Sequence, residues 1–361
     1  MHIVKVSLQN FRNYENLDLE FHKNTNMIYG DNAQGKTNIL ESISVGATTK
    51  SHKNALPREM IRIGCDEAHI RIILNKKGLD QKIDIHLRKS KSKGIAINGV
   101  PIKKSGELMG LLNIVFFSPE DLNIIKNGPD ERRRFMDMEL CQLDKIYFHN
   151  LTEYKKALTQ RNKLLKQIYN DPKLKDTLSL WDEPLIKYGK KVIETRRVFI
   201  KHISEILRDI SNRITGGKEN IILDYIPNTS EDSFALNLEL SHERDLRNMT
   251  TCVGPHRDDI SFLNDGIDLK KFGSQGQQRT CALALKLSEI ELVKKITNDT
   301  PVLLLDDVLS ELDRNRQNYL LDNIKDIQTM ITCTGLEEFV NSNLTLNRII
   351  RVITGTVEIE K

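Results

Sequence analysis

Short runs of alternating or clustered apolar residues mark the first part of the chain. They cover residues 1–9, 17–22, 69–75, 83–102 and 113–117. Runs of this length and period predict β-strands, and the turn residues within 83–102 predict a hairpin there. We therefore expect residues 1–118 to be rich in strands.

The pattern becomes helical between residues 119 and 215. Glycine is scarce there, charged residues are frequent, and apolar side chains recur at the spacing of a helix face. A heptad interrupted by Arg161 runs through Leu151, Tyr154, Leu158, Leu165 and Ile168. This segment predicts a helical lobe inserted into the chain.

Short elements of both kinds return after residue 215. The pattern predicts strands at 220–226, 235–240, 302–305 and 329–333, and a helix from about residue 276. Mixed strands and helices of this kind are typical of an α/β domain. We therefore expect residues 216–361 to complete the domain that residues 1–118 begin.

A glycine-rich loop at residues 30–38 is the first candidate binding site in the sequence. It reads GDNAQGKTN, which has the spacing of a phosphate-binding loop, and it lies between an apolar strand and a helical pattern. The competing interpretation is an ordinary glycine turn, and the flanking strand and helix favour the phosphate loop. The candidate nucleotide-binding residues are Gly30, Asp31, Asn32, Ala33, Gln34, Gly35, Lys36, Thr37 and Asn38.

The residue types in this loop suit a nucleoside triphosphate. Glycines let backbone N–H groups curl around phosphates, and the following helix adds the positive end of its dipole. Lys36 is placed to neutralise the β- and γ-phosphates, and the Thr37 hydroxyl is placed to bind Mg²⁺. ATP and Mg²⁺ are therefore the expected cofactors.

Two adjacent aspartates end an apolar strand within PVLLLDDVLSELD, residues 301–313. A carboxylate beside a phosphate loop holds the magnesium ion, so we assign Asp306 to the metal together with Thr37. Asp307 is expected to polarise the attacking water, and with Lys36 it forms the candidate catalytic pair. An ordinary buried strand with a polar end has the same sequence pattern. The assignment of these aspartates to a magnesium site therefore depends on the presence of the phosphate loop.

A second anion-binding element is predicted at residues 273–292. Ser274 can cap the helix that begins there, Gly276 permits close approach of a ligand, and Gln277 adds a polar contact. One chain then has two phosphate-binding elements for one triphosphate. The economical arrangement is a pair of chains, in which each serine helix meets the ATP held by the partner.

The order of these motifs resembles the ATP-binding-cassette heads of the SMC class of chromosome proteins, and more closely the RecF family of bacterial recombination and repair proteins. The resemblance covers nearly the whole chain. It rests on NFRNY (10–14), GDNAQGKTN (30–38), FSPEDLNIIKNGPDERRRFMD (117–137), QRNKLLK (160–166), GPHRDD (254–259), GSQGQQRT (273–280) and LLLDDVLSELD (303–313).

The resemblance implies an α/β fold, namely an SMC-like ATP-binding-cassette P-loop ATPase head with an inserted helical lobe. Residues 1–118 would form the first part of the head and residues 119–215 the lobe. Residues 216–361 would form the second part of the head, with the signature motif and the Walker B strand.

The resemblance also implies a function in recombinational repair and replication restart. A protein of this family is expected to bind double-stranded DNA and gap junctions between single and double strands, and to dimerise on ATP. With RecO and RecR it would promote RecA loading and SOS induction. An SMC-type chromosome or nuclease-partner head is the main alternative, although its long coiled coil is missing here.

Particular residues receive roles from the same resemblance. Ser274, Gly276 and Gln277 would touch the partner's γ-phosphate, and residues 310–313 would line the dimer interface as the D-loop. Arg12 of the NFRNY motif is expected to reach the nucleotide.

Two departures from the general cassette pattern concern hydrolysis. Asp307 stands where transporters carry glutamate, and Thr332 or Thr334 stands where many cassettes carry a switch histidine. The shorter carboxylate and the missing histidine predict slow hydrolysis and a switch instead of a motor. With the DNA binding that the resemblance implies, we expect a weak DNA-dependent ATPase.

Composition and charge exclude several classes of protein. The 361-residue chain has a net charge of +4, no secretory signal and no long apolar run, so we expect a cytoplasmic protein without a membrane partner. Its five cysteines are scattered singly, which argues against zinc and disulfide sites. A transporter ATPase subunit would need a membrane partner, and a small-molecule kinase would not need the signature helix.

Two basic runs are candidates for DNA contact. They are RKSKSK at residues 88–93 and ERRRF at residues 131–135. The acidic neighbours of the second run also suit internal ion pairs. His256 and Arg257 are expected to form a structural turn before the signature helix.

Overall fold

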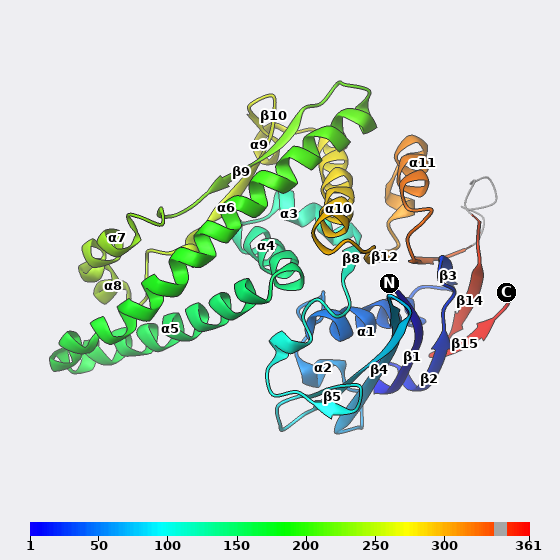
Figure 1. Ribbon diagram of the computed structural model, residues 1–361, viewed down its shortest axis with the longest axis horizontal. Helices are drawn as coiled ribbons and strands as arrows, with labels where there is room; N and C mark the ends of the chain where they lie inside the picture. Colours follow the sequence, from blue (N-terminus) through cyan, green and yellow to red (C-terminus); the bar gives the residue numbers. More distant parts are fainter. Residues whose placement is uncertain (336–344) are drawn as a thin grey trace. The chain divides into compact units, whose positions relative to one another are not determined.

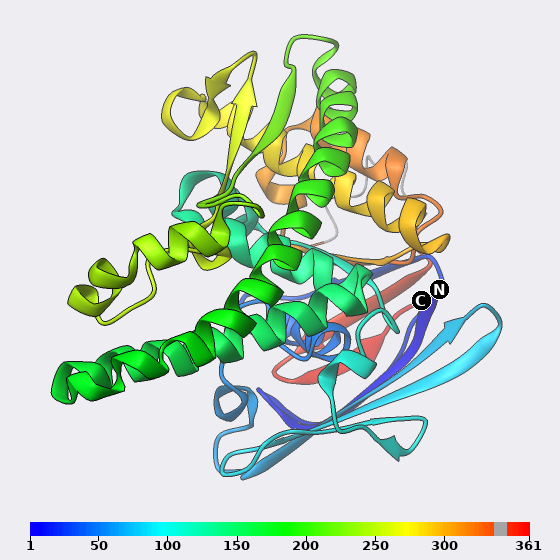
Figure 2. The ribbon, with the colours of Figure 1, turned by 60° about the vertical axis from the view of Figure 1, so that its left-hand side comes forward.

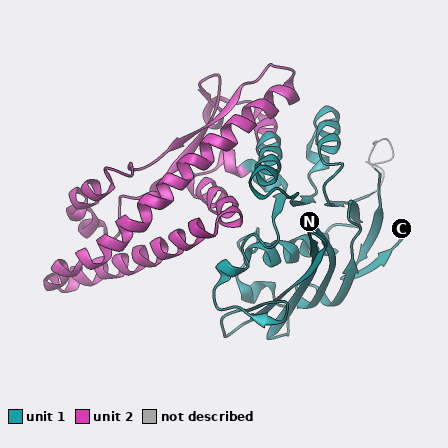
Figure 3. Ribbon diagram, viewed as in Figure 1, with its two compact units in different colours: residues 1–122, 282–361 teal, residues 123–281 magenta. Residues whose placement is uncertain are grey.

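The computed structural model describes residues 1–335 and 345–361, and the chain folds as two compact units (Figures 1 and 3). Unit 1 contains residues 1–122 and 282–361, and unit 2 contains residues 123–281. The sequence assigned residues 216–281 to the ATPase head, but the structure places them in unit 2. The reason is that the strands of this segment pack along the helices of unit 2 and join neither sheet of unit 1.

An antiparallel sheet forms one layer of unit 1. Buried and less buried residues alternate along β4 and β5, so one face of this sheet packs into the core. The predicted strands at 1–9, 17–22 and 69–75 and the hairpin at 83–102 lie here. In sheet order, the strands are β2 (Tyr14–Glu20), β1 (His2–Phe11), β4 (Glu67–Lys76), β5 (Leu79–Arg88), β6 (Gly94–Ile97) and β7 (Val100–Pro101).

A second sheet of unit 1 is parallel except for its edge strand β15. All residues of β8, β12 and β13 are buried, which explains their continuous apolar sequences. In sheet order, the strands are β15 (Thr356–Ile359), β14 (Arg348–Ile353), β3 (Thr25–Tyr29), β13 (Thr329–Cys333), β12 (Val302–Asp306) and β8 (Ile114–Phe117).

Helix α1 (Lys36–Thr48) contacts strands of both sheets of unit 1. It is buried on nearly all sides, and its sequence is therefore apolar or small around most of its circumference. This position fixes the helix that follows the phosphate loop. Unit 1 also contains α2 (Pro57–Met60), η1 (Ser105–Glu107), η2 (Pro119–Asp121), η5 (Leu309–Glu311) and α11 (Arg314–Asn323).

Unit 2 is built on two long helices, α5 (Lys145–Asn170) and α6 (Ser179–Thr215), which pack along each other (Figure 2). A three-stranded sheet β11-β10-β9 packs on α6 and α4. The elements of this unit also include α4 (Pro129–Leu143), η3 (Pro172–Thr177), β9 (Ile221–Ile226), α8 (His242–Asn248), η4 (Pro255–Arg257), β10 (Asp259–Asn264), β11 (Ile267–Asp268) and α9 (Leu269–Phe272). Helices α3 (Leu122–Lys126) and α10 (Gln275–Thr297) cross the unit boundaries.

The strand predicted at residues 235–240 is wrong, because this segment lies in helix α7 (Phe234–Leu240). The alternating leucines suggested a strand. In the structure the buried pair is Phe234 and Leu238, four residues apart, whereas Leu236 and Leu240 are exposed. The spacing of the burial is therefore helical, and the two exposed leucines produced the false alternation.

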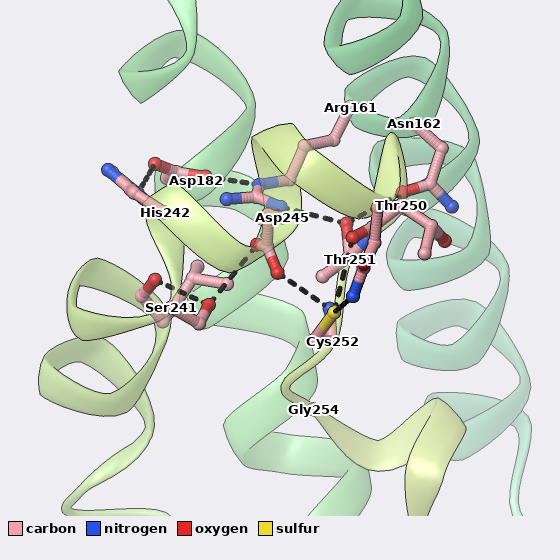
Figure 4. Close-up of polar contacts among 12 residues, drawn as sticks. Arg161, Asn162, Asp182, Ser241, His242, Asp245, Thr250, Thr251, Cys252 and Gly254 are labelled. Carbon is pink, nitrogen blue, oxygen red and sulfur yellow. Dashed lines mark hydrogen bonds and ion pairs between the residues drawn. The ribbon is translucent and has the colours of Figure 1, made fainter.

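The arginine that interrupts the predicted heptad is fully buried in unit 2. Arg161 donates from Nε to Asp182 at 2.6 Å and from Nη1 to Asp245 at 2.6 Å (Figure 4). The same Nη1 also lies 2.9 Å from the hydroxyl of Thr251. These contacts join α5 to α6, α8 and the following loop, so Arg161 is a structural centre of the lobe.

A second buried arginine, Arg196 of α6, pairs with Asp137 and Asp258 at 2.8 and 2.9 Å. Burial alone would raise the pKa of Asp137, but the charges of Arg196 and Lys155 and the hydroxyl of Tyr147 lower it to about 2.

Among the described residues, no helix has the length and apolar character needed to cross a membrane.

Candidate functional site

The phosphate loop occupies the connection between β3 and α1 in unit 1. Asp31, Asn32 and Ala33 are exposed at its tip, whereas Gly35 and Lys36 are buried at the start of the helix. Gly35 has φ = +117°, and a Cβ at this position would collide with the side-chain amide of Asn13. The second glycine of the motif is therefore required both by its backbone angle and by the packing behind it.

Lys36 lies folded over the loop. Its ammonium donates to the carbonyl oxygens of Gly30 at 2.6 Å and Asp31 at 2.9 Å. The side chain is 5% exposed, so these carbonyls satisfy a charge that has little access to water. This places the one cation of the loop beside the concave backbone that the motif predicts for phosphate.

The loop and the Walker B strand meet through two side chains. The Thr37 hydroxyl donates to Oδ1 of Asp306 at 2.8 Å, and the hydroxyl of Thr332 donates to the same oxygen at 2.8 Å. Strand β13 lies between β3 and β12, and the register places Thr332 directly beside Asp306. The two predicted metal ligands, Thr37 and Asp306, are thus brought together at the carboxyl end of the parallel strands.

Asp306 and Asp307 differ in environment. Burial raises the pKa of Asp306 and the charge of Asp307 adds to this, while the hydrogen bonds from Thr332 and Thr37 oppose it. Asp307 adopts φ = +52°, and its N–H donates to the hydroxyl of Thr332 at 2.9 Å. A left-handed backbone at a residue other than glycine is strained, and Thr332 holds this strained turn in place.

The residues present suit a magnesium ion. Mg²⁺ prefers oxygen ligands and is usually held by one or two protein groups together with substrate phosphates. The Thr37 hydroxyl and the Asp306 carboxylate supply such oxygens beside the loop. A divalent cation would also compensate the buried negative charge of Asp306.

Arg12 is engaged by a buried carboxylate in this structure. Its Nε and Nη2 donate to the two carboxylate oxygens of Glu41 on α1, each at 2.7 Å, and its Nη1 donates to the Glu59 carbonyl. Burial alone would raise the pKa of Glu41, but hydrogen bonds from Arg12 and Ser51 lower it. The assignment of Arg12 to the nucleotide stays a prediction, since it requires this bidentate pair to open.

The signature residues lie at the start of α10, in unit 2. The hydroxyl of Ser274 accepts a hydrogen bond from the Gln277 N–H, and the Gln277 side chain accepts one from the Ser274 N–H. This reciprocal pair is a capping box, and it confirms that Ser274 caps the helix. Ser274 is exposed, and Gly276 is partly exposed in the first turn.

The segment predicted as the D-loop follows Asp307 directly. The hydroxyl of Ser310 donates to the Asp307 carbonyl at 2.9 Å, and Asp313 caps α11 by accepting from the N–H groups of Asn315 and Arg316. Thr332 forms hydrogen bonds with both aspartates, and Thr334 is exposed just beyond the end of β13. The assignment of either threonine to the switch position stays a prediction.

The ERRRF run forms ion pairs within unit 2. Arg132 pairs with Asp259 through two nitrogens, Arg133 with Asp130, and Arg134 with Glu131. Ion pairs within the unit are therefore confirmed for this run, and its contact with DNA stays a prediction.

His256 and Arg257 lie in the short 3₁₀ helix η4, which confirms the predicted turn. Nδ1 of His256 lies 2.6 Å from the Tyr154 hydroxyl, and burial lowers the pKa of this histidine to about 4. A histidine that stays neutral and hydrogen-bonded within the lobe has a structural role.

Sequence reasoning missed the residues that support the loop from behind. Asn13 and Tyr14 belong to the NFRNY motif, but only Arg12 received a role. Asn13 donates to the Gln34 carbonyl at 2.8 Å, and the Tyr14 hydroxyl donates to the Gly35 carbonyl at 3.1 Å. The motif itself was the signal that pointed to them.

Comparison with known proteins identifies relatives along the whole chain. Residues 2–358 match the family described as the RecF/RecN/SMC N terminal domain. The chain is 59% identical over 359 residues to the DNA replication and repair protein RecF of Agathobacter rectalis, with 99% of both chains covered. It is 58% identical over 358 residues to the RecF protein of Lachnoclostridium phytofermentans, again with 99% of both chains covered.

Solved structures of a RecF protein and of an Smc head are similar to this chain. The recombination mediator protein RecF–ATP of the RecFOR pathway superimposes with a TM-score of 0.93 at 34% identity, covering 100% of this chain and 98% of that one. The Smc head domain of Pyrococcus furiosus gives a TM-score of 0.55 at 17% identity, covering 99% of this chain and 95% of that one. The second likeness supports the predicted cassette fold alone.

Proposed function

Since the chain belongs to the RecF family of ATP-binding proteins of DNA replication, repair and recombination, we propose that it is an ATP-operated DNA clamp. In this proposal it binds ATP with Mg²⁺, pairs with a second copy of itself while ATP is bound, and holds DNA in the paired state. The observation that carries the proposal is the 2.8 Å hydrogen bond between Thr37 and Asp306, which joins the phosphate loop to the Walker B strand.

Binding of the triphosphate requires Lys36 to change partners. Its ammonium lies on the carbonyls of Gly30 and Asp31. Hydrogen bonds to ionised phosphate oxygens are stronger than those to neutral carbonyls, so the lysine gains by turning to the β- and γ-phosphates. Bound Mg²⁺ would supply neutralisation of the phosphate charge, and Thr37 and Asp306 are the residues that would hold it.

Pairing of two chains completes the site in this proposal. The exposed Ser274, with Gly276 and Gln277, would meet the γ-phosphate bound by the partner, and residues 310–313 would contribute the D-loop. The capping box supports this, because it presents the amino end of α10 with its backbone N–H groups in an ordered first turn.

Hydrolysis in this proposal is slow and works as a release step. Asp307 would orient the attacking water from a short carboxylate, and Thr334 lacks the imidazole that many cassettes place there. A weak, DNA-dependent ATPase of this kind keeps the paired state long-lived and opens it after turnover.

The DNA substrates that we propose are double-stranded DNA and the junction between duplex and a single-stranded gap. RecR, acting with RecO, would be the protein partner at such a gap, and RecA loading and SOS induction would follow indirectly. Since these substrates belong to the chromosome, we place this action in the bacterial cytoplasm.

Sedimentation velocity tests the proposal. The protein is measured alone, with ATP, with ADP, and with ATP and a gapped duplex. We expect a change from monomer to dimer with ATP and not with ADP, and co-sedimentation with the gapped duplex in the presence of ATP. A sedimentation coefficient that ATP leaves unchanged would contradict the proposal.

A further inference from the structure

We propose that the carboxyl-terminal hairpin of the chain is part of the nucleotide site, because it holds the phosphate loop in its curved form from the outside. The hairpin consists of β14, β15 and the turn Thr354–Gly355 between them. This inference rests on the proposed ATP binding of the loop. It adds positioning residues from a segment to which the motifs assign no role.

The reason lies in the backbone of a phosphate loop. If its N–H groups point inward to bind phosphate, its carbonyl groups point outward and need donors. The carbonyl of Gln34 receives two donors in this structure. One is the Asn13 side-chain amide at 2.8 Å, and the other is the Gly355 N–H at 3.2 Å.

The side chain of Gln34 is held by the same turn. Its Oε1 accepts a hydrogen bond from the Thr354 N–H at 2.5 Å and another from the Thr354 hydroxyl at 3.2 Å. The turn therefore fixes both the backbone and the side chain of the residue that precedes Gly35. This pair of contacts orients the peptide between Gln34 and Gly35.

The hairpin also packs closely on the beginning of the loop. Strand β14 pairs in parallel with β3, and Arg351 lies opposite Tyr29. A Cβ on Gly30 would collide with the carbonyl oxygen of Val352. The first glycine of the loop thus leaves room for the backbone of β14, independently of any contact that it makes with phosphate.

Gly355 itself has no room for a side chain. Its φ is +75°, and a Cβ there would lie 2.7 Å from the carbonyl oxygen of Asn13. Asn13 also accepts a hydrogen bond from the Asn38 side chain at 2.8 Å. Asn13 and Gly355 therefore clamp the Gln34 carbonyl from two sides, and a methyl group at residue 355 would force them apart.

Gly355→Ala tests the proposal, with Gly78→Ala as the matched control. Gly78 lies in the β4–β5 turn of the same unit with φ = +82°, and a Cβ there meets nothing within 4 Å. Both substitutions carry the strain of a left-handed alanine, but only the first disturbs the clamp. The measurements are the ATP dissociation constant by calorimetry and the melting temperature without nucleotide.

We expect Gly355→Ala to weaken ATP binding about tenfold relative to Gly78→Ala, in a protein that is still folded at the temperature of the binding measurement. The collision with the Asn13 carbonyl should also give Gly355→Ala the lower melting temperature of the two. The effects of Gly355→Ala and Asn13→Ala on ATP affinity should also be less than additive, because both act on the Gln34 carbonyl. Equal ATP affinity in folded Gly355→Ala and Gly78→Ala proteins would overturn the inference. Absence of ATP binding by the wild-type protein would instead contradict the proposed function.

Hydrogen exchange of the wild-type protein tests the same inference without a variant. ATP should slow exchange in the segment 350–358 as well as in the phosphate loop, because occupancy of the loop stabilises the hydrogen bonds that Thr354 and Gly355 donate. Protection of the loop with unchanged exchange at 350–358 would overturn it. This outcome keeps the inference testable if Gly355→Ala does not fold.

Discussion

The Thr37 hydroxyl donates a hydrogen bond to Oδ1 of Asp306 at 2.8 Å, although 269 positions separate the two residues in the chain. Thr37 is the second residue of α1, which follows β3 and the phosphate loop, and Asp306 ends β12, which lies two strands from β3 in the parallel sheet. This contact brings together the phosphate loop and the carboxylate of β12, the two parts of the site that would bind a triphosphate and its metal ion.

Replacement of Lys36 by alanine should abolish ATP-dependent pairing. The lysine supplies the cation of the loop, and a second chain must approach the phosphates that it neutralises. Analytical ultracentrifugation with saturating ATP measures this. A Lys36→Ala protein that forms dimers with ATP as the wild type does would refute the assignment of this loop.

The two aspartates should separate binding from turnover. Asp307→Asn keeps the size of the side chain but removes the charge that orients water, so it should retain ATP binding and accumulate the paired state. Asp306→Ala removes a metal ligand and should weaken ATP binding in the presence of Mg²⁺ as well as turnover. Loss of ATP binding in Asp307→Asn would show that the two roles are exchanged.

Thr332 should act as a positioning residue for both aspartates. Thr332→Val removes the hydroxyl that accepts from the Asp307 N–H and donates to Asp306. An unsatisfied buried donor costs about 1–3 kcal/mol, so single-turnover hydrolysis should fall about tenfold or more while ATP affinity changes little.

Rescue and pH dependence distinguish this role from general destabilisation. Thr332→Ser keeps the hydroxyl and should restore hydrolysis. The Thr332 hydrogen bond lowers the pKa of Asp306, so its loss in Thr332→Val should move the acid limb of the pH–rate profile to higher pH. Unchanged hydrolysis and an unchanged profile in Thr332→Val would rule out the role.

The parts of this fold that the sequence predicts are those in which one local pattern decides the structure. The parallel strands at 302–305 and 329–333 are buried on both faces and therefore read as continuous apolar runs. The glycine spacing of the loop follows from its backbone geometry. The segment 235–240 was mispredicted because its exposed leucines do not report its burial.

Contacts between distant segments could not be predicted in the same way. Nothing local shows that Arg12 pairs with Glu41 or that Thr354 binds Gln34. The first pair requires α1 to pack on β1, and the second requires β14 to pair with β3. The sequence does contain a pattern that indicates the β14–β15 hairpin. Alternating apolar residues on both sides of Thr354–Gly355 are typical of two strands with a tight turn.

The lobe should lose stability in acid through Asp137. Its pKa in the folded protein, about 2, lies below its ordinary value of 3.8. The charged form therefore stabilises the fold above the ordinary value, and this contribution, about 2 kcal/mol, is lost as the pH falls toward 2. Burial raises the pKa of the neighbouring Asp258, which acts in the opposite direction.

Comparison with Asp137→Asn isolates this contribution. Urea unfolding of the wild type and of Asp137→Asn at pH 6 and pH 3 measures the free-energy difference between them. We expect a smaller difference at pH 3 than at pH 6. A difference that does not change with pH would show that Asp137 does not titrate in this way.

Hydrolysis by mixed variants tests most directly the central claim that two chains share each ATP site. Ser274→Arg should bind ATP as a monomer with nearly unchanged affinity but fail to pair and to hydrolyse, because the larger side chain blocks approach of the signature helix. Lys36→Ala should be inactive because it cannot neutralise the phosphates of its own ATP.

In a mixed dimer, one composite site carries both substitutions and the other carries neither. We predict that hydrolysis returns when the two inactive proteins are combined. A collapse of ATP affinity in the isolated Ser274→Arg protein, with no hydrolysis on mixing, would show that the serine serves its own chain's nucleotide and would contradict the account.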